Sequence, residues 1–197
     1  MKKLFAVAFL AVMTISATAQ DFKKFRFGPT IGLNISTMNS VADHSSKVGF
    51  NVGALAEYNF TDNIFMTGAL KFSQKGFKYD DGDNKVNPGY IELPIHAGYR
   101  YSFNDKFSIF GEFGPYLAVG VCGKDKDDDS SIDYFGGEND FKTMRAKRFD
   151  FGLGFAAGVE YSKIQARVGY DFGLTKIFEG DGAPKNRNFY IALSYMF

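Results

Sequence analysis

The chain has 197 residues and a formal net charge of +1, with 23 lysines and arginines against 22 carboxylates. This balance leaves no basic stripe, so we expect no nucleic-acid partner. The composition of 23 Phe, 11 Tyr and 22 Gly with no Trp favours β-structure with tight interior positions over a helical domain. Cys122 is alone, which excludes an intramolecular disulfide.

The N-terminus has the three parts of a secretory signal peptide. Lys2 and Lys3 form its basic part, residues 4–15 are apolar, and residues 16–20 offer small residues for cleavage. The apolar run is shorter than the roughly 20 residues that a membrane-spanning helix needs. We expect cleavage after Ala19, which makes residues 1–19 a signal peptide and residues 20–197 a single domain. No Cys stands at the cleavage site, so a lipoprotein anchor is not expected.

The remaining chain alternates apolar residues with polar or small ones, which is the period of β-strands. The clearest segment sets Ile91, Leu93 and Ile95 on one face and Glu92, His96 and Arg100 on the other. Eight segments show the pattern, at about residues 25–36, 48–60, 64–77, 91–103, 107–121, 149–161, 164–174 and 188–197.

The connections between these segments are alternately long and short. The short ones are residues 61–63, 104–106 and 162–163. The long, polar ones are about residues 37–47, 78–88, 122–147 and 176–187. Strict alternation sends every long connection to one rim, as in outer-membrane barrels, which have short periplasmic turns and longer extracellular loops. The even strand count predicts that both termini are periplasmic.

The apolar face is predicted to point outward, toward lipid. An eight-stranded barrel is only just wide enough for side chains to fill its interior, and about four large apolar residues per strand cannot all fit there. The opposite face is rich in Gly, Ser, Ala and Thr with sparse charges. Aromatic residues collect near strand ends, as in an interfacial girdle: Phe60, Tyr101, Phe103, Phe107, Phe149, Tyr161 and Phe197.

These observations predict an all-β fold, an eight-stranded antiparallel up-and-down transmembrane β-barrel, in the outer membrane of a Gram-negative cell. Closure is required because an open sheet would leave hydrogen bonds unmade in lipid. The competing interpretation is a soluble periplasmic lipocalin-like carrier, whose apolar face would line the interior. The alternating last strand ends in Tyr195 and Phe197, which resembles the signal by which the barrel-assembly machinery recognises its clients.

Six short motifs, in this order and spacing, resemble the small outer-membrane β-barrel proteins of Bacteroidetes, the PorT-like "porin family". The resemblance covers essentially the whole mature chain and implies the barrel fold and the outer-membrane location. It does not imply one activity, since members are mostly of unknown function and some are linked to secretion or gliding. The motifs are Phe72-Ser-Gln-Lys-Gly-Phe77, Tyr90-Ile-Glu-Leu-Pro94, Gly111-Glu-Phe-Gly-Pro-Tyr116, Asp150-Phe-Gly-Leu153, Tyr170-Asp-Phe-Gly-Leu-Thr175 and Asn186-Arg-Asn-Phe189.

The predicted inner face holds charges of nearly balanced sign, which we name the lumen charge network. We favour a hydrogen-bonded ion network that plugs the lumen, because unpaired buried charge is costly. The alternative is a polar path for protons, ions or small solutes. The network comprises Arg26, Glu57, Lys71, Glu92, His96, Arg100, Glu112, Asp150, Glu160, Arg167 and Asp171.

No catalytic, cofactor or metal site is predicted. His96 is the only conceivable acid–base centre, but it lies mid-strand and no nucleophile can be assigned to it. The segment 125–133 echoes a calcium-binding loop, yet Ser130 stands where Gly is needed and Gly136 where a bidentate Glu is needed. Asp80, Asp81, Asp83 and Asp181 lie on other long connections, where divalent cations could bridge them to lipopolysaccharide.

The leading functional hypothesis is a non-enzymatic outer-membrane barrel with a structural, adhesive or partner-binding role. The alternative is a narrow channel, or a component of solute uptake or secretion. A membrane hydrolase centred on His96 is a third. The partners expected are outer-membrane lipid and lipopolysaccharide, the barrel-assembly machinery during biogenesis, and an envelope or extracellular protein of unknown identity.

Overall fold

The computed structural model describes residues 24–38, 44–79, 85–127, 130–133, 135, 146–178 and 183–197. The predicted signal peptide and its cleavage site lie outside these residues. Within the described ranges, the structure has no helix that is both long enough and apolar enough to cross a membrane.

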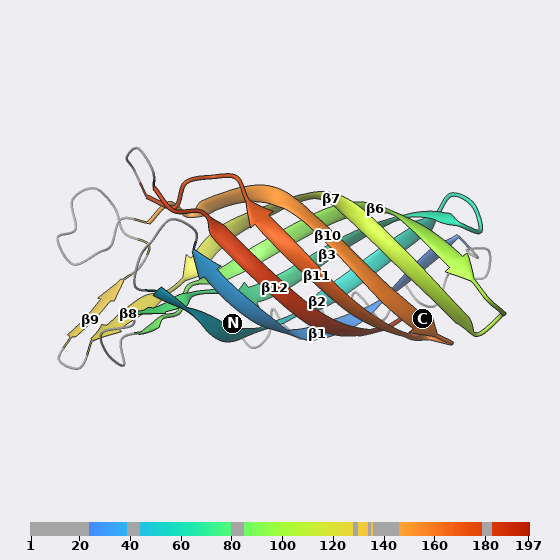
Figure 1. Cartoon of the computed structure of the whole chain (residues 1–197), viewed down its shortest axis with the longest axis horizontal. Helices are drawn as coiled ribbons and strands as arrows, with labels where there is room; N and C mark the ends of the chain where they lie inside the picture. The colour runs from blue at the N-terminus through green and yellow to red at the C-terminus, as the bar shows by residue number, and fades with distance from the viewer. Residues whose placement is uncertain are drawn as a thin grey trace, which may run out of the picture.

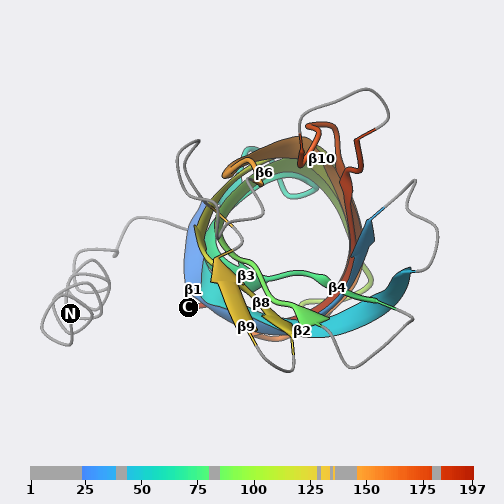
Figure 2. The ribbon, with the colours of Figure 1, turned by 90° about the vertical axis from the view of Figure 1, so that its left-hand side faces the viewer.

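Eight strands close into a barrel in which every neighbour is antiparallel (Figures 1 and 2). The first and last strands close the wall, with Ile31 opposite Leu193, so the predicted fold class is confirmed. The strands are β1 (Phe25–Met38), β2 (His44–Asn59), β3 (Ile64–Gln74), β6 (Gly89–Ser102), β7 (Phe107–Cys122), β10 (Phe149–Tyr161), β11 (Ile164–Gly173) and β12 (Asn186–Tyr195).

Side-chain oxygens stabilise the tight connections at one end of the barrel. Thr61 Oγ1 accepts the backbone N–H of Ile64 at 2.9 Å. Asn104 Oδ1 accepts the backbone N–H groups of Lys106 and Phe107, each at 2.9 Å. Thr and Asn form such local turns because a short polar side chain can reach backbone two or three residues ahead. We call this the turn end, and the opposite end, with the long connections, the loop end.

The prediction that residues 78–88 and 122–147 are only loops is wrong in part. They contain β5 (Lys85–Val86), β8 (Lys124–Asp127) and β9 (Ser130–Asp133), which with β4 (Phe77–Tyr79) extend β2 into a sheet at the loop end (Figure 1). The third predicted strand also ends earlier, at Gln74, before Gly76 adopts a positive φ of 152°. Strands of two to four residues are too short to show a period of two, which is why the sequence pattern missed them.

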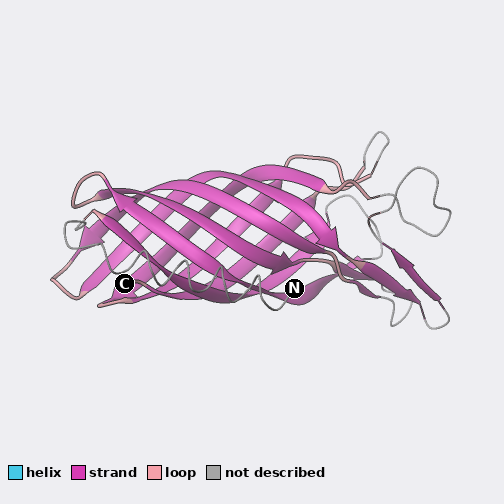
Figure 3. Cartoon of the chain, turned by 180° about the vertical axis from the view of Figure 1, so that it is seen from behind, coloured by secondary structure: helices cyan, strands magenta, loops and turns pink. Residues whose placement is uncertain are grey.

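The apolar face points outward, as predicted. Burial alternates with a period of two along β7, and its outward residues Ile109, Phe113 and Leu117 are exposed. The same is true around the wall, for example at Ile31 and Leu193. Figure 3 shows the same tilted strands from the other side. The lipocalin-like interpretation, which needs an inward apolar face, is therefore wrong.

The interior is bulkier than the sequence analysis predicted. Among the described residues, five aromatic rings on the barrel strands are buried: Phe65, Tyr90, Phe110, Tyr116 and Tyr190. Glycines on neighbouring strands make the room. Gly98 is paired with Phe65, and a Cβ there would lie 2.3 Å from the ring. Gly169 is paired with Tyr190, and a Cβ there would lie 2.4 Å from that ring. The absence of a side chain at these inward glycines thus gives each ring the space to pack against the neighbouring strand.

Aromatic side chains surround the turn end on its outer surface. Tyr58 and Phe60 have ring centroids 5.0 Å apart, and Tyr101 and Phe103 are also 5.0 Å apart. The ring centroid of Phe197 lies 5.7 Å from that of Phe27 on the first strand. Such a ring of aromatics is the arrangement that membrane barrels place at the lipid–water interface.

Candidate functional site

The lumen holds charged side chains at three levels, and the lowest lies near the turn end. Arg26 Nη1 donates to Glu160 Oε1 at 2.6 Å, and Arg100 Nη2 donates to Glu57 Oε2 at 2.6 Å. Arg26 also donates to Glu57, and Gln165 Nε2 donates to Glu160 Oε2 at 2.8 Å. We call these five side chains the turn-end cluster. It joins β1, β2, β6, β10 and β11, so it crosses the lumen.

The middle cluster surrounds Glu112. Arg167 Nε lies 3.0 Å from Glu112 Oε1, and His96 Nδ1 lies 3.4 Å from the same oxygen. Thr67 Oγ1 donates to Glu112 Oε2 at 3.2 Å. Arg167 Nη2 also donates to Gln165 Oε1 at 3.1 Å, which connects this cluster to the one below. A carboxylate with three polar partners is well compensated for its burial.

The lysine cluster lies nearer the loop end. Glu92 is fully buried and contacts two lysines, with Lys71 Nζ at 2.8 Å and Lys75 Nζ at 2.5 Å. Each ammonium also lies over an aromatic ring, Lys71 at 4.7 Å from the centroid of Tyr190 and Lys75 at 4.7 Å from that of Tyr116. Cation–π contacts of this kind strengthen when the groups are removed from water.

The last two predicted carboxylates are held mainly by neutral donors. Asp150 accepts from Thr175 Oγ1 at 2.7 Å, Asn186 Nδ2 at 2.8 Å and Tyr116 OH at 3.1 Å. Asp171 Oδ2 accepts from Asn188 Nδ2 at 3.1 Å.

Across the side chains that the structure describes, the lumen charges balance in number. The lumen contains six carboxylates and six cationic side chains, so its charge is balanced without counter-ions from solvent. The carboxylates are Glu57, Glu92, Glu112, Asp150, Glu160 and Asp171, and the cations are Arg26, Lys47, Lys71, Lys75, Arg100 and Arg167.

An apolar cap lies above the lysine cluster. Phe135 is buried, and its ring is 5.5 Å from that of Tyr90. A Cβ on Gly120 would lie 2.2 Å from the Phe135 ring, so glycine is required there. Arg148 Nη2 donates to the Phe135 carbonyl at 3.1 Å and stacks over its ring. We call the set of buried apolar residues here the loop-end cap: Met38, Tyr90, Tyr116, Ala118, Phe135, Ala146 and Ile177.

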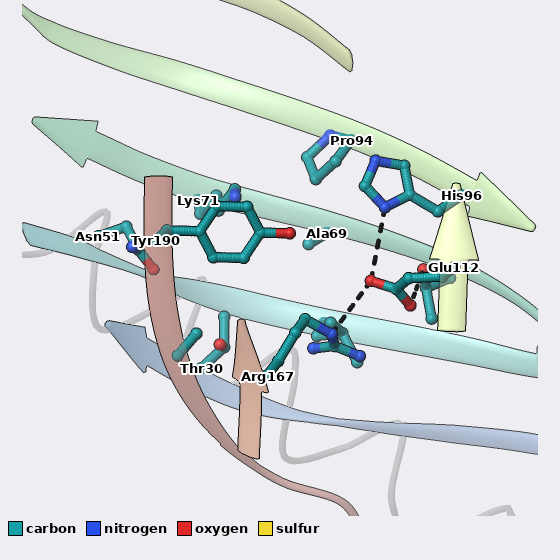
Figure 4. Close-up of a pocket in the computed structure, with 12 residues that line it drawn as sticks. Thr30, Asn51, Ala69, Lys71, Pro94, His96, Glu112, Arg167 and Tyr190 are labelled. Carbon is teal, nitrogen blue, oxygen red and sulfur yellow. Dashed lines mark hydrogen bonds and ion pairs between the residues drawn. The ribbon is translucent and has the colours of Figure 1, made fainter. Parts of the chain in front are cut away.

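A cavity of about 30 Å³ lies in the middle of the lumen (Figure 4). In Figure 4, His96, Glu112 and Arg167 form a connected row along one side, and Tyr190 lies across from them with Lys71. His96 Nε2 has no hydrogen-bond partner among the described residues. A Cβ on Gly154 would lie 3.0 Å from this nitrogen and 2.8 Å from Asp171 Oδ1. The cavity has room for about one or two water molecules, and its polar lining suits them.

The sequence of residues 18–179 matches the family model described as the outer membrane protein beta-barrel domain. The chain belongs to this family. Membership places the protein in the outer membrane as an integral β-barrel, in agreement with the outward apolar wall.

This outer-membrane β-barrel protein is similar in structure to several solved barrels. Neisserial surface protein A has a TM-score of 0.50 at 12% identity, over 88% of this chain and 97% of that one. OprG from Pseudomonas aeruginosa has a TM-score of 0.46 at 14% identity, over 88% and 95%. Ail of Yersinia pestis has a TM-score of 0.44 at 15% identity, over 88% and 99%. At these identities the likeness concerns the fold. No curated protein matches the sequence.

The structure of this outer-membrane β-barrel protein places all eleven residues of the predicted lumen charge network inside the barrel. Residues that are close in the sequence are not always the ones in contact. His96 contacts Glu112 on the next strand, and not Glu92 or Arg100 on its own strand. Lys75 and Gln165 also belong to the network, although they were not predicted to. Both have the same strand parity as their neighbours in it, Lys71 and Arg167, and that parity could have found them.

The described residues contain no group of three or more His, Cys, Asp or Glu side chains that could hold a metal ion. The acidic positions Asp80, Asp81, Asp83 and Asp181 lie outside the described residues. The side chains of the described part of the calcium-like segment 125–133 are also outside what the structure describes.

Proposed function

We propose that this protein is a non-enzymatic outer-membrane barrel with a closed lumen, whose loop end has a structural, adhesive or partner-binding role. The observation that carries this proposal is that ion pairs link strands across the lumen at three successive levels. The cavity among them is only about 30 Å³. The loop-end cap adds an apolar layer above these polar ones. An open diffusion pore needs a wider barrel.

The energetics of the ion pairs support a closed state. Glu57 and Glu92 are completely buried, and each contacts two cationic side chains. Opening a path would separate such pairs. Removing one partner of a buried pair costs about 3–5 kcal/mol, since the other charge remains buried and unpaired. The network is therefore expected to hold the lumen shut under thermal motion.

Liposome swelling tests the closed lumen. Vesicles containing the folded protein should swell in small sugars no faster than protein-free vesicles. Rapid swelling with protein verified as folded would contradict the proposal.

A narrow path for protons or water is the second candidate, and the position of His96 favours it. Its Nε2 has no partner among the described residues and lines the cavity. We propose the His96→Phe variant as its test, since phenylalanine keeps the ring and removes both nitrogens. A proton flux into dye-loaded vesicles that this variant abolishes would support the path. Equal, background-level flux for both proteins would exclude it.

We also propose the orientation and export route that the sequence predicts. The chain would be exported by a signal peptide cleaved after Ala19, with both termini periplasmic and the loop end outside the cell. Tyr195 and Phe197 are exposed and point outward at the turn end, where the assembly machinery could contact them. Assignment to the PorT-like proteins of Bacteroidetes is part of the same proposal.

The sheet β2–β4–β5–β8–β9 is the surface that we propose for an envelope or extracellular protein partner. It projects beyond the barrel wall at the loop end (Figure 1). Deleting residues 124–133 should abolish partner binding to intact cells while leaving the barrel folded. Unchanged binding would contradict this assignment.

A further inference from the structure

Three adjacent strands carry a basic residue where their outward apolar stripe ends at the loop end. On β12 the outward series from Phe197 back to Phe189 continues with Arg187. The outward residues of β10 begin at Phe149, preceded by Lys147. Beyond β11, the outward residue Leu174 is followed by Lys176. The strand order β12–β11–β10 makes these three positions neighbours along the rim.

The basic edge is confined to these strands. At the corresponding positions of the other five, the outward stripe ends in an uncharged residue. These residues are Thr37, Ser46, Gln74, Gly89 and Gly123. Among these eight stripe-end positions, all of them in the described part of the chain, the cationic side chains therefore occupy one sector of the wall.

Backbone hydrogen bonds hold this sector together. Lys147 N donates to Ile177 O at 2.8 Å, and Ile177 N donates to Pro184 O at 2.9 Å. Arg187 Nη1 donates to Gly173 O at 2.8 Å and to Asn186 O at 3.0 Å. Both acceptors are neutral carbonyl oxygens.

The wall beside and below Arg187 is aromatic. Phe172 is the register partner of Arg187 on the neighbouring strand, with its ring centroid 5.4 Å from the guanidinium, 4.6 Å from the ring centroid of Tyr170 and 5.8 Å from that of Phe155. These rings lie on the lipid-facing surface of β10 and β11. A cationic edge above a broad apolar surface matches a lipid with an anionic headgroup and several acyl chains.

We propose that the loop-end edge of β10–β12 is a binding site for lipid A, the phosphorylated anchor of lipopolysaccharide. Lys147, Lys176 and Arg187 would contact its phosphates while its acyl chains cover Phe155, Tyr170 and Phe172. Arginine suits this role because its guanidinium can make paired hydrogen bonds to phosphate.

The choice of lipid A rests on the proposed orientation, in which the loop end meets the outer leaflet. The site itself does not depend on whether the lumen is closed. Conductance through the barrel would contradict the proposed function and leave lipid binding unaffected.

The test is lipid retention measured by native mass spectrometry of the folded protein released from detergent. The probes are lipid A, the same lipid with its phosphates removed, and phosphatidylglycerol. The K147Q/K176Q/R187Q variant is compared with K24Q/K106Q/K163Q, which loses the same charge from exposed lysines at the turn end. Boiled and unboiled gel mobility verifies that each variant is folded.

We expect wild type to retain lipid A in preference to both other lipids. The loop-end variant should bind at least about tenfold more weakly, since every 1.4 kcal/mol of lost contact is a factor of ten. The turn-end variant should match wild type. If R187Q disturbs folding through its carbonyl bonds, K147Q/K176Q should still show a loss. Equal affinities in the two triple variants, or equal retention of any other probe, would overturn the proposal.

Discussion

The guanidinium of Arg100 donates to the carboxylate of Glu57 at 2.6 Å, although 43 residues separate them in the chain. Glu57 has no exposed surface and also contacts Arg26. One carboxylate on β2 therefore links β1 and β6 across the inside of the barrel.

Replacing Glu57 by Gln should destabilise the barrel. The amide keeps the shape but leaves Arg26 and Arg100 to share Glu160 alone, so buried positive charge goes uncompensated. We expect the free energy of unfolding to fall by about 3 kcal/mol, measured by urea titration in lipid vesicles. Asp105→Asn, at an exposed turn, is the control and should be neutral. A loss no larger than that of the control would show that the turn-end cluster is not structural.

Gly169→Ala should also destabilise the protein, because the added Cβ would lie 2.4 Å from the Tyr190 ring. Overpacking of this kind costs about 1–3 kcal/mol. Gly68→Ala is the matched control, since a Cβ there has nothing within 4 Å. Combining Gly169→Ala with Tyr190→Leu should restore part of the loss, as judged by the temperature at which the gel mobility shift occurs. Equal effects of the two alanine variants would contradict the claim that Gly169 leaves space for the Tyr190 ring.

Cys122 gives a direct test of orientation. It is exposed at the loop end, and it is the only cysteine in the chain. A membrane-impermeant maleimide should label it on intact cells. In a C122S background, Asp105→Cys at the turn end should be labelled only after lysis. The reverse pattern would place the loop end in the periplasm.

His96→Ala should leave lipid and peptide hydrolysis at the background level that we also expect for the wild-type protein. Its contact is the carboxylate of Glu112, and the arrangement around it supplies no nucleophile. Phospholipase and protease assays of detergent-folded protein provide the measurement. Turnover above background that the substitution abolishes would establish a hydrolase and contradict the non-enzymatic proposal.

The wall of the barrel was predictable from sequence because its residues alternate between two solvents, lipid and a polar interior. The segment 149–161 was predicted to the residue, since Phe149 and Tyr161 both lie on the apolar face, with a long polar connection before Phe149 and a short turn after Tyr161. The strands β4, β5, β8 and β9 were missed because segments of two to four residues are too short to show a period of two.

The sequence predicted which charged residues face the lumen, but not which of them contact one another. Parity placed His96 and Glu112 on the inner face, but their contact depends on the register between β6 and β7. Phe65 and Phe110 were missed because a pattern that separates apolar from polar residues assigns large rings to lipid. They are inside because Gly98 and Gly158 on neighbouring strands make space for them.

Single-channel recording in planar bilayers tests the closed lumen most directly. The wild-type protein, folded and inserted, should give no conductance steps. A variant with Arg26, Lys71, Lys75, Arg100 and Arg167 replaced by Ser should give steps, because it removes long cationic side chains from all three levels of the lumen. Regular conductance steps from the wild-type protein would contradict the account.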